Sequence, residues 1–76
     1  MEELKHYIQQ EIQDIAFTKV AFDQSLIRSK LLDSITVVDL VVAIEEKTGV
    51  HVPLADVKEE NFDTINKMID YLQKKS

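Results

Sequence analysis

Asp33 and Ser34 are the residues of this chain whose types and positions could support chemistry. The apolar residues after them recur with helical spacing, which predicts a helix beginning at Ser34. Asp is preferred just before a helix because its carboxylate accepts backbone N–H groups of the first turn. The Ser34 hydroxyl would then lie exposed at the positive end of the helix dipole, where an attached phosphate group is favoured. Alone, the pair is only a helix-cap signal, so the rest of the chain must decide.

A hydrolytic site made of Asp33, Ser34 and His51 is the catalytic alternative. Neighbouring Asp33 and Ser34 cannot hold a histidine between them, as a catalytic triad requires. The chain has one Gly, so it cannot form a Gly-rich loop that would stabilise an oxyanion or surround a phosphate. With two histidines and no cysteine, a zinc site is not expected. We therefore predict a non-catalytic protein.

The charge is acidic and concentrated in the middle of the chain. The net charge is -5, and residues 33–63 hold eight acidic side chains against two lysines. A nucleic-acid binder would show the opposite sign. An acidic face instead favours basic protein partners and speeds their encounter. The sequence thus predicts protein partners and no binding of nucleic acid.

The 76 residues are enough for one small domain, expected over residues 1–76. The first 15 residues are charged and lack the apolar run of a signal peptide. The longest apolar run, residues 40–44, is far shorter than the ~20 residues of a membrane helix. We expect a cytoplasmic monomer that does not insert into membranes.

The spacing of apolar residues predicts long helices over residues 2–16, over residues 34–48 and from about residue 65 onward. Gly49 is expected to end the central helix in the left-handed conformation. Their buried faces are predicted to be Leu4, Ile8, Ile12 and Ile15; Val37, Val38, Leu40, Val41, Ile44 and Thr48; and Ile65, Met68, Ile69 and Leu72.

The connecting segments complete the expected fold. Residues 17–33 are predicted to form an ordered loop held by its apolar residues, with a helical turn near residues 25–28. Residues 54–60 should form a short helix with Leu54 and Val57 facing inward, and Asp63 or Thr64 should cap the last helix. The fold class is all-α: a small antiparallel bundle of three long helices and one short helix, with a long loop between helices 1 and 2.

The stretch LLDSITVVDLVVAIEEKTGVHVP, residues 31–53, resembles the acyl carrier protein family. In that family a Ser in an Asp-Ser-Leu-like motif opens the second helix and carries 4′-phosphopantetheine, and here the motif is Asp33-Ser34-Ile35. The resemblance implies that Ser34 is the attachment residue and that Asp33 also orients the metal-bound cofactor of the modifying enzyme. It further implies a thioester carrier that presents cargo to enzymes and does no catalysis itself.

The resemblance also implies partner-binding residues on the second helix. The positions that match acidic contacts to basic partner patches are Asp39, Glu45 and Glu46, and those that match apolar contacts are Ile35 and Val42. Thr36 and Lys47 dilute the acidic stripe relative to many fatty-acid carriers. The implied partners are a phosphopantetheinyl transferase and the acyl- or aminoacyl-loading ligases and synthases that carry basic patches.

Two questions stay open from the sequence. Residues 31–34 and 61–69 look like the D-alanyl and aminoacyl carriers of the same superfamily, whereas residues 37–46 fit fatty-acid or polyketide carriers equally. An acidic helical adaptor that is never modified would share every feature except the need for Ser34. The cargo and the partner enzymes are therefore left undecided.

Overall fold

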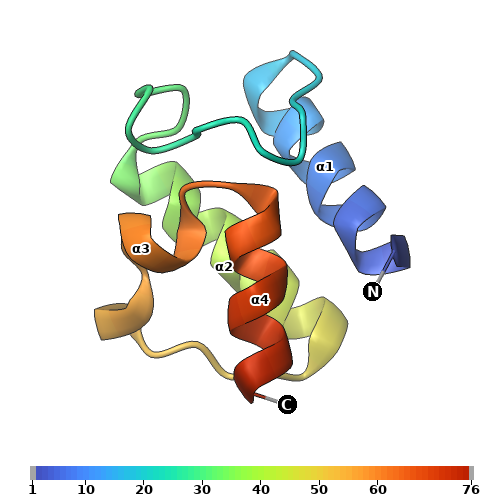
Figure 1. Cartoon of the computed structure of the whole chain (residues 1–76), viewed down its shortest axis with the longest axis vertical. Coiled ribbons are helices and arrows are strands. Elements are labelled where there is room, and N and C mark those ends of the chain that lie inside the picture. The colour runs from blue at the N-terminus through green and yellow to red at the C-terminus, as the bar shows by residue number, and fades with distance from the viewer. Residues whose placement is uncertain (1, 76) are drawn as a thin grey trace.

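The computed structural model describes residues 2–75 as an all-helical fold (Figure 1). Its elements are α1 (Glu2–Ala16), α2 (Ser34–Thr48), the 3-10 helix η1 (Leu54–Asp56), α3 (Glu59–Phe62) and α4 (Ile65–Lys75). α1 packs against both α2 and α4, and α3 packs against α4. The loop from α1 to α2 crosses the top of the molecule in Figure 1. The predicted fold class, a small helical bundle with a long loop before its second helix, is confirmed.

Both ends of α2 form as the local sequence predicts. The Asp33 carboxylate accepts a hydrogen bond from the Thr36 N–H at 2.8 Å and starts the helix. Gly49 has φ 74 and its N–H donates to the Glu45 carbonyl at 2.7 Å, which ends the helix. Between these ends, β-branched residues have only modest helix propensity, so burial must stabilise the helix. The buried residues of α2 are Val37, Leu40, Val41 and Ile44.

The core contains the apolar faces that the helical spacing predicts. In α1 the buried residues are Ile8 and Ile12, and in α4 they are Ile65, Met68, Ile69 and Leu72. Val38, predicted to be in the core, is only half-buried. Leu4 and Ile15 lie at the edge of the core. Within residues 2–75 no helix is both long enough and apolar enough to cross a membrane.

The loop over residues 17–33 is ordered by its own apolar residues and by polar contacts to the helices. Val20, Leu26 and Leu32 are each at most 3% exposed. The Gln9 side chain donates to the Val20 carbonyl at 2.6 Å. The turn in this loop is centred at residues 27–30, slightly later than predicted, and Lys30 closes it with φ 64.

Two predictions for the second connection are wrong. Leu54 is 73% exposed and does not face inward, and residues 54–60 do not form one helix because Lys58 is extended between η1 and α3. The prediction that Asp63 or Thr64 caps α4 is confirmed for Thr64, whose hydroxyl accepts from the Lys67 N–H at 3.0 Å. Asp63 instead ends α3 and is buried, with its carboxylate facing the long loop.

Candidate functional site

Ser34 is the first residue of α2, and its side chain is exposed. Among residues 2–75, no hydrogen bond engages its hydroxyl. Hydrogen bonds from the Thr36 N–H, the Thr36 hydroxyl and the Ile35 N–H lower the pKa of the neighbouring Asp33 carboxyl. An ionised carboxylate and an accessible hydroxyl therefore stand side by side at the start of the helix.

A cavity of about 390 Å³ opens beside Ser34. This volume lies within the roughly 300–1,000 Å³ that small-molecule sites occupy. Its walls come from α2, the long loop and the η1–α3 segment, and most of them are apolar. Besides Ser34, the lining residues are Ile27, Val37, Val38, Leu54, Val57, Lys58 and Glu59. Sequence reasoning missed this cavity because the loop and α2 meet the η1–α3 segment, which lies well after α2 in the chain.

The loop wall of the cavity is held by Asp63. Its Oδ1 atom accepts hydrogen bonds at 2.9 Å from the Ser25 hydroxyl, the Ile27 N–H and the Arg28 N–H. Burial disfavours the charged carboxylate, but the hydrogen bonds from Arg28, Ser25 and Ile27 outweigh burial and lower the pKa of Asp63. Asp63 is therefore ionised at neutral pH while only 4% exposed.

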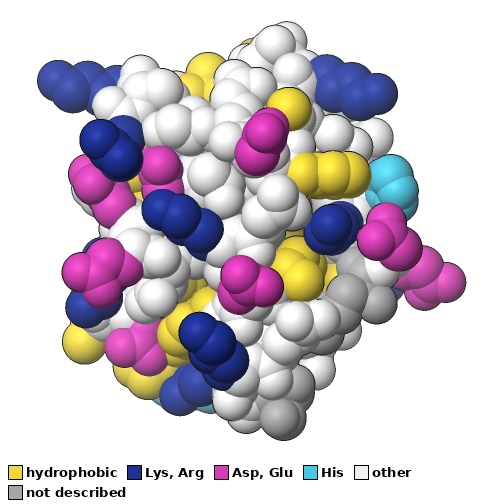
Figure 2. Space-filling model, viewed as in Figure 1, with side chains coloured by type: hydrophobic (Ala, Val, Ile, Leu, Met, Phe, Trp, Pro, Cys, Tyr) yellow, Lys and Arg dark blue, Asp and Glu magenta, His cyan; other side chains and the backbone are white. Residues whose placement is uncertain are grey.

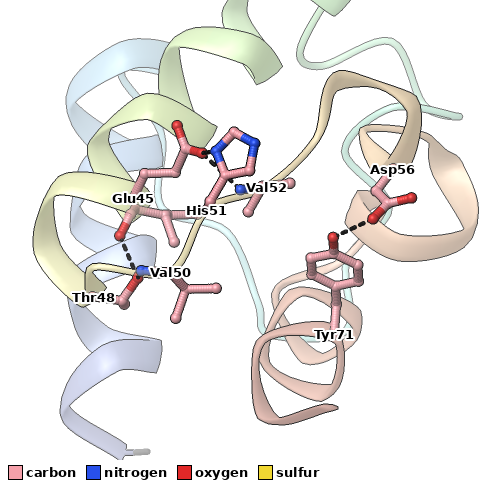
Figure 3. A network of polar contacts seen from close by, with 8 residues as sticks. Glu45, Thr48, Val50, His51, Val52, Asp56 and Tyr71 are labelled. Atoms are coloured by element: carbon pink, nitrogen blue, oxygen red, sulfur yellow. Dashed lines mark hydrogen bonds and ion pairs between the residues drawn. The ribbon is translucent and has the colours of Figure 1, made fainter. Parts of the chain in front are cut away.

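The η1 wall is held by a second carboxylate. The Tyr71 hydroxyl on α4 donates to the Asp56 carboxylate at 2.5 Å (Figure 3), and the Asn61 side chain donates to the Asp56 carbonyl at 2.9 Å. Burial, together with the hydrogen bond and the charge of Asp56, raises the pKa of Tyr71 to about 12. Both contacts fix η1, which carries the cavity residue Leu54.

The far end of α2 has a different character. The Glu45 carboxylate accepts from the Val52 N–H at 2.7 Å and contacts His51 Nδ1 at 3.1 Å (Figure 3). Ser34 and His51 therefore lie near opposite ends of a 15-residue helix, which spans roughly 22 Å. The structure does not bring together the hydrolytic set that was considered from the sequence.

The residues predicted to bind partners divide into two groups. Ile35 is 73% and Val42 45% exposed, and Asp39 and Glu46 are exposed as well. Glu45 is only half-buried and is already engaged by residues of its own chain. On the α3–α4 face that Figure 2 shows, acidic and basic side chains alternate around apolar patches. That face is therefore not a surface of one charge sign.

The residues at the start of α2 suit a phosphopantetheine group. The Ser34 oxygen is accessible, a phosphate attached to it would lie at the positive end of the helix dipole, and the apolar cavity is adjacent. Among the described residues, no cluster of His, Asp or Glu could hold a metal ion. The exposed Ser34 hydroxyl beside an apolar cavity leaves room for a covalently attached group.

Comparison with known proteins identifies the class. Residues 6–72 match the family model described as a phosphopantetheine attachment site. The chain is 35% identical over 63 residues to the acyl carrier protein of Buchnera aphidicola subsp. Acyrthosiphon pisum (strain Tuc7), covering 83% of this chain and 76% of that protein. It is 30% identical over 69 residues to the D-alanyl carrier protein of Streptococcus suis (strain 98HAH33), covering 88% and 87%.

A third relative is the acyl carrier protein of Acidothermus cellulolyticus, 36% identical over 62 residues, with 82% of this chain and 71% of that protein covered. The chain belongs to the phosphopantetheine-attachment family of carrier proteins. Its prosthetic group is 4′-phosphopantetheine. Acyl and D-alanyl carriers match it at similar identity, so identity alone does not distinguish the two cargoes.

Proposed function

We propose that Ser34 is the attachment residue and that the chain carries an acyl group as a thioester for partner enzymes. The observation that carries this proposal is the exposed Ser34 hydroxyl at the edge of an apolar cavity. When bound, the arm supplies the thiol that holds the cargo. Asp33 starts the helix and keeps a negative charge next to the hydroxyl, where the modifying enzyme's metal-bound cofactor must be placed.

The apolar lining favours an acyl chain over an amino acid. Each methylene that leaves water contributes up to about 0.8 kcal/mol, less the free energy needed to widen the cavity. Val37 and Val38 on α2, Ile27 on the loop and Val57 after η1 supply suitable walls. A charged amine would lose hydration in the same place, so it should stay in water.

A D-alanyl or aminoacyl carrier is the second candidate. It is supported by the Streptococcus suis relative, which matches over nearly the whole of both chains. The Glu59 carboxylate at the cavity could also pair with an ammonium group. The two candidates differ in where the cargo lies, and that difference can be measured.

Attachment is tested first by mass. The purified protein is incubated with coenzyme A, magnesium and a broad-specificity phosphopantetheinyl transferase, and its intact mass is measured. Wild type should gain one phosphopantetheine, and Ser34→Ala should gain none. A wild type that gains nothing would overturn the carrier function at this residue and favour the unmodified acidic adaptor.

Cargo is tested by thermal unfolding of the pantetheinylated, octanoylated and alanylated forms. We expect octanoylation to raise the melting temperature above that of the pantetheinylated form, because the chain buries apolar surface in the cavity. Alanylation should leave it nearly unchanged. Stabilisation by alanyl and not by octanoyl would reverse this assignment and favour the aminoacyl carrier.

A further inference from the structure

We propose that Asp63 is a positioning residue for Ser34. Its buried carboxylate fixes the loop that leads into α2, and this loop forms one wall of the cavity. The inference rests on the proposed attachment at Ser34 and adds a residue that lies 29 positions later in the chain. Asp63 contacts neither Ser34 nor, by our proposal, the arm; it acts through the loop.

The geometry of Asp63 suits this role. Its side chain is 4% exposed, and its Oδ1 atom accepts from Ser25, Ile27 and Arg28, which precede it by 35–38 residues. Its backbone carbonyl also accepts from the Leu26 N–H at 2.7 Å. A buried carboxylate is costly unless several donors satisfy it, and here the donors all come from the loop.

Asp63 is not needed to start α4, because Thr64 provides that cap. The loop is also held by apolar burial of its own, since Leu26 and Leu32 lie in the core. What the Asp63 carboxylate adds is direction: the N–H groups of consecutive residues Ile27 and Arg28 both point to one oxygen. This orients the turn that places Ile27 on the cavity.

The turn is connected to Ser34 through hydrogen bonds within the loop. The Ser29 hydroxyl donates to the Ser25 carbonyl at 2.6 Å, and the Ser29 N–H donates to the Ser25 hydroxyl at 3.2 Å. The Leu32 N–H then donates to the Leu26 carbonyl at 2.9 Å. Leu32 is 3% exposed and is followed directly by the Asp33 cap and Ser34. Movement of the turn should therefore move the start of α2.

The transferase must place the Ser34 oxygen accurately against its cofactor, and a misplacement of about 1 Å can lower a rate by ~10²-fold. We therefore expect Asp63→Ala to lower kcat/KM for phosphopantetheine attachment by about tenfold. Asp63→Asn keeps an oxygen in the Oδ1 position but forms weaker, uncharged hydrogen bonds. Its kcat/KM for attachment should therefore lie between those of wild type and Asp63→Ala.

Two controls separate positioning from general stability. Ile12 lies in α1 and in the core, so Ile12→Val should lower stability modestly while leaving the loop residues and the Asp63 carboxylate unchanged. Asp70→Asn removes the charge of an exposed α4 carboxylate. Attachment kinetics are measured at a temperature where every variant is folded, and amide hydrogen exchange is recorded at Ile27 and Arg28. Both controls should retain kcat/KM within about twofold, since neither alters the loop that places the Ser34 oxygen.

The positioning role is overturned if Asp63→Ala is modified as fast as wild type although Ile27 and Arg28 have lost protection, or if Ile12→Val slows attachment equally. If Asp63→Ala does not fold, Ser25→Ala takes its place; it removes one of the donors to Oδ1 and should reduce kcat/KM about threefold, and equality with wild type again overturns the role. A wild type that is not modified overturns the proposed function, and the positioning role with it. Failure of the proposed function therefore appears in wild type itself, whereas failure of the positioning role alone appears only in the variants.

Discussion

α2 and α4 each begin within two residues of an aspartate, but the two helix starts are built differently. Asp33 is exposed and its carboxylate bonds to the first turn of its own helix. Asp63 is 4% exposed and its carboxylate bonds to a loop far earlier in the chain. The pKa of both carboxyls is lowered, by the Thr36 N–H for Asp33 and by donors of the loop, against burial, for Asp63.

This difference separates the accessible residue from the structure that supports it. The start of α2 is open and Ser34 is exposed there, as the proposed attachment by an enzyme requires. The start of α4 is closed, and the buried charge there organises the loop in front of Ser34. By our proposal, the buried carboxylate near the start of α4 thus holds in place the loop that leads to the exposed start of α2.

The largest expected effect compares the two aspartates directly. Asp63→Ala leaves the Ser25 hydroxyl and the Ile27 and Arg28 N–H groups without their acceptor, so it should lower the free energy of unfolding by roughly 3 kcal/mol. Asp33→Ala should lower it less, because water can replace an exposed cap. Urea unfolding of both variants measures the two losses of unfolding free energy. Equal losses would contradict the difference proposed between the buried and the exposed aspartate.

Acid should destabilise the fold in part through Asp63. Its pKa is lowered in the folded state, so the unfolded chain, whose Asp has its ordinary value of 3.8, takes up the proton first as the pH falls. The stabilisation is therefore complete above that value and is lost as the pH falls through the lower folded pKa. Unfolding free energies measured from pH 6 downward should fall more steeply in wild type than in Asp63→Asn; parallel profiles would contradict this.

The sequence predicts what is local and misses what is distant. The bounds of α1 and α2, the Asp33 cap and the Gly49 stop are set by contacts within about four residues, and all are as predicted. The Asp63 contacts join segments 35–38 residues apart, and the cavity also combines separate segments of the chain, neither of which spacing can show. The sequence did hold one sign that Asp63 would be buried: it lies between the apolar residues Phe62 and Ile65, and the structure shows both to be fully buried.

The wrong predictions have the same origin. Leu54 was expected to face inward because apolar residues usually do, yet η1 presents it at the mouth of the cavity, 73% exposed. At the start of α4 the sequence leaves Asp63 and Thr64 as alternative caps, and the structure assigns the cap to Thr64. Neither choice can be made without knowing what packs against the segment.

A smaller effect tests which residue starts α4. Thr64→Ala removes the hydroxyl that accepts from the Lys67 N–H and should lower the free energy of unfolding by about 1 kcal/mol. Thr64→Ser keeps the hydroxyl and is the matched control. Attachment at Ser34 should be unchanged in both variants, since the loop contacts of Asp63 remain. A slower attachment in Thr64→Ala would mean that the cap, and not Asp63, positions the loop.

The smallest stability effect is expected at Glu46. Glu46 and its neighbour Glu45 differ as the two aspartates do, one being exposed and the other bonded to another segment of the chain. Glu46 is exposed, whereas the Glu45 carboxylate accepts from the Val52 N–H and contacts His51. Glu46→Lys should change the free energy of unfolding by less than about 0.5 kcal/mol. It should nevertheless slow association with a basic partner enzyme at low salt, and added salt should remove the difference.

Glu45→Lys makes the same charge change but also removes the acceptor of the Val52 N–H, so it should lower stability as well. Stopped-flow association and urea unfolding of both variants separate the two effects. If Glu46→Lys associates as fast as wild type at low salt, Glu46 does not take part in partner binding.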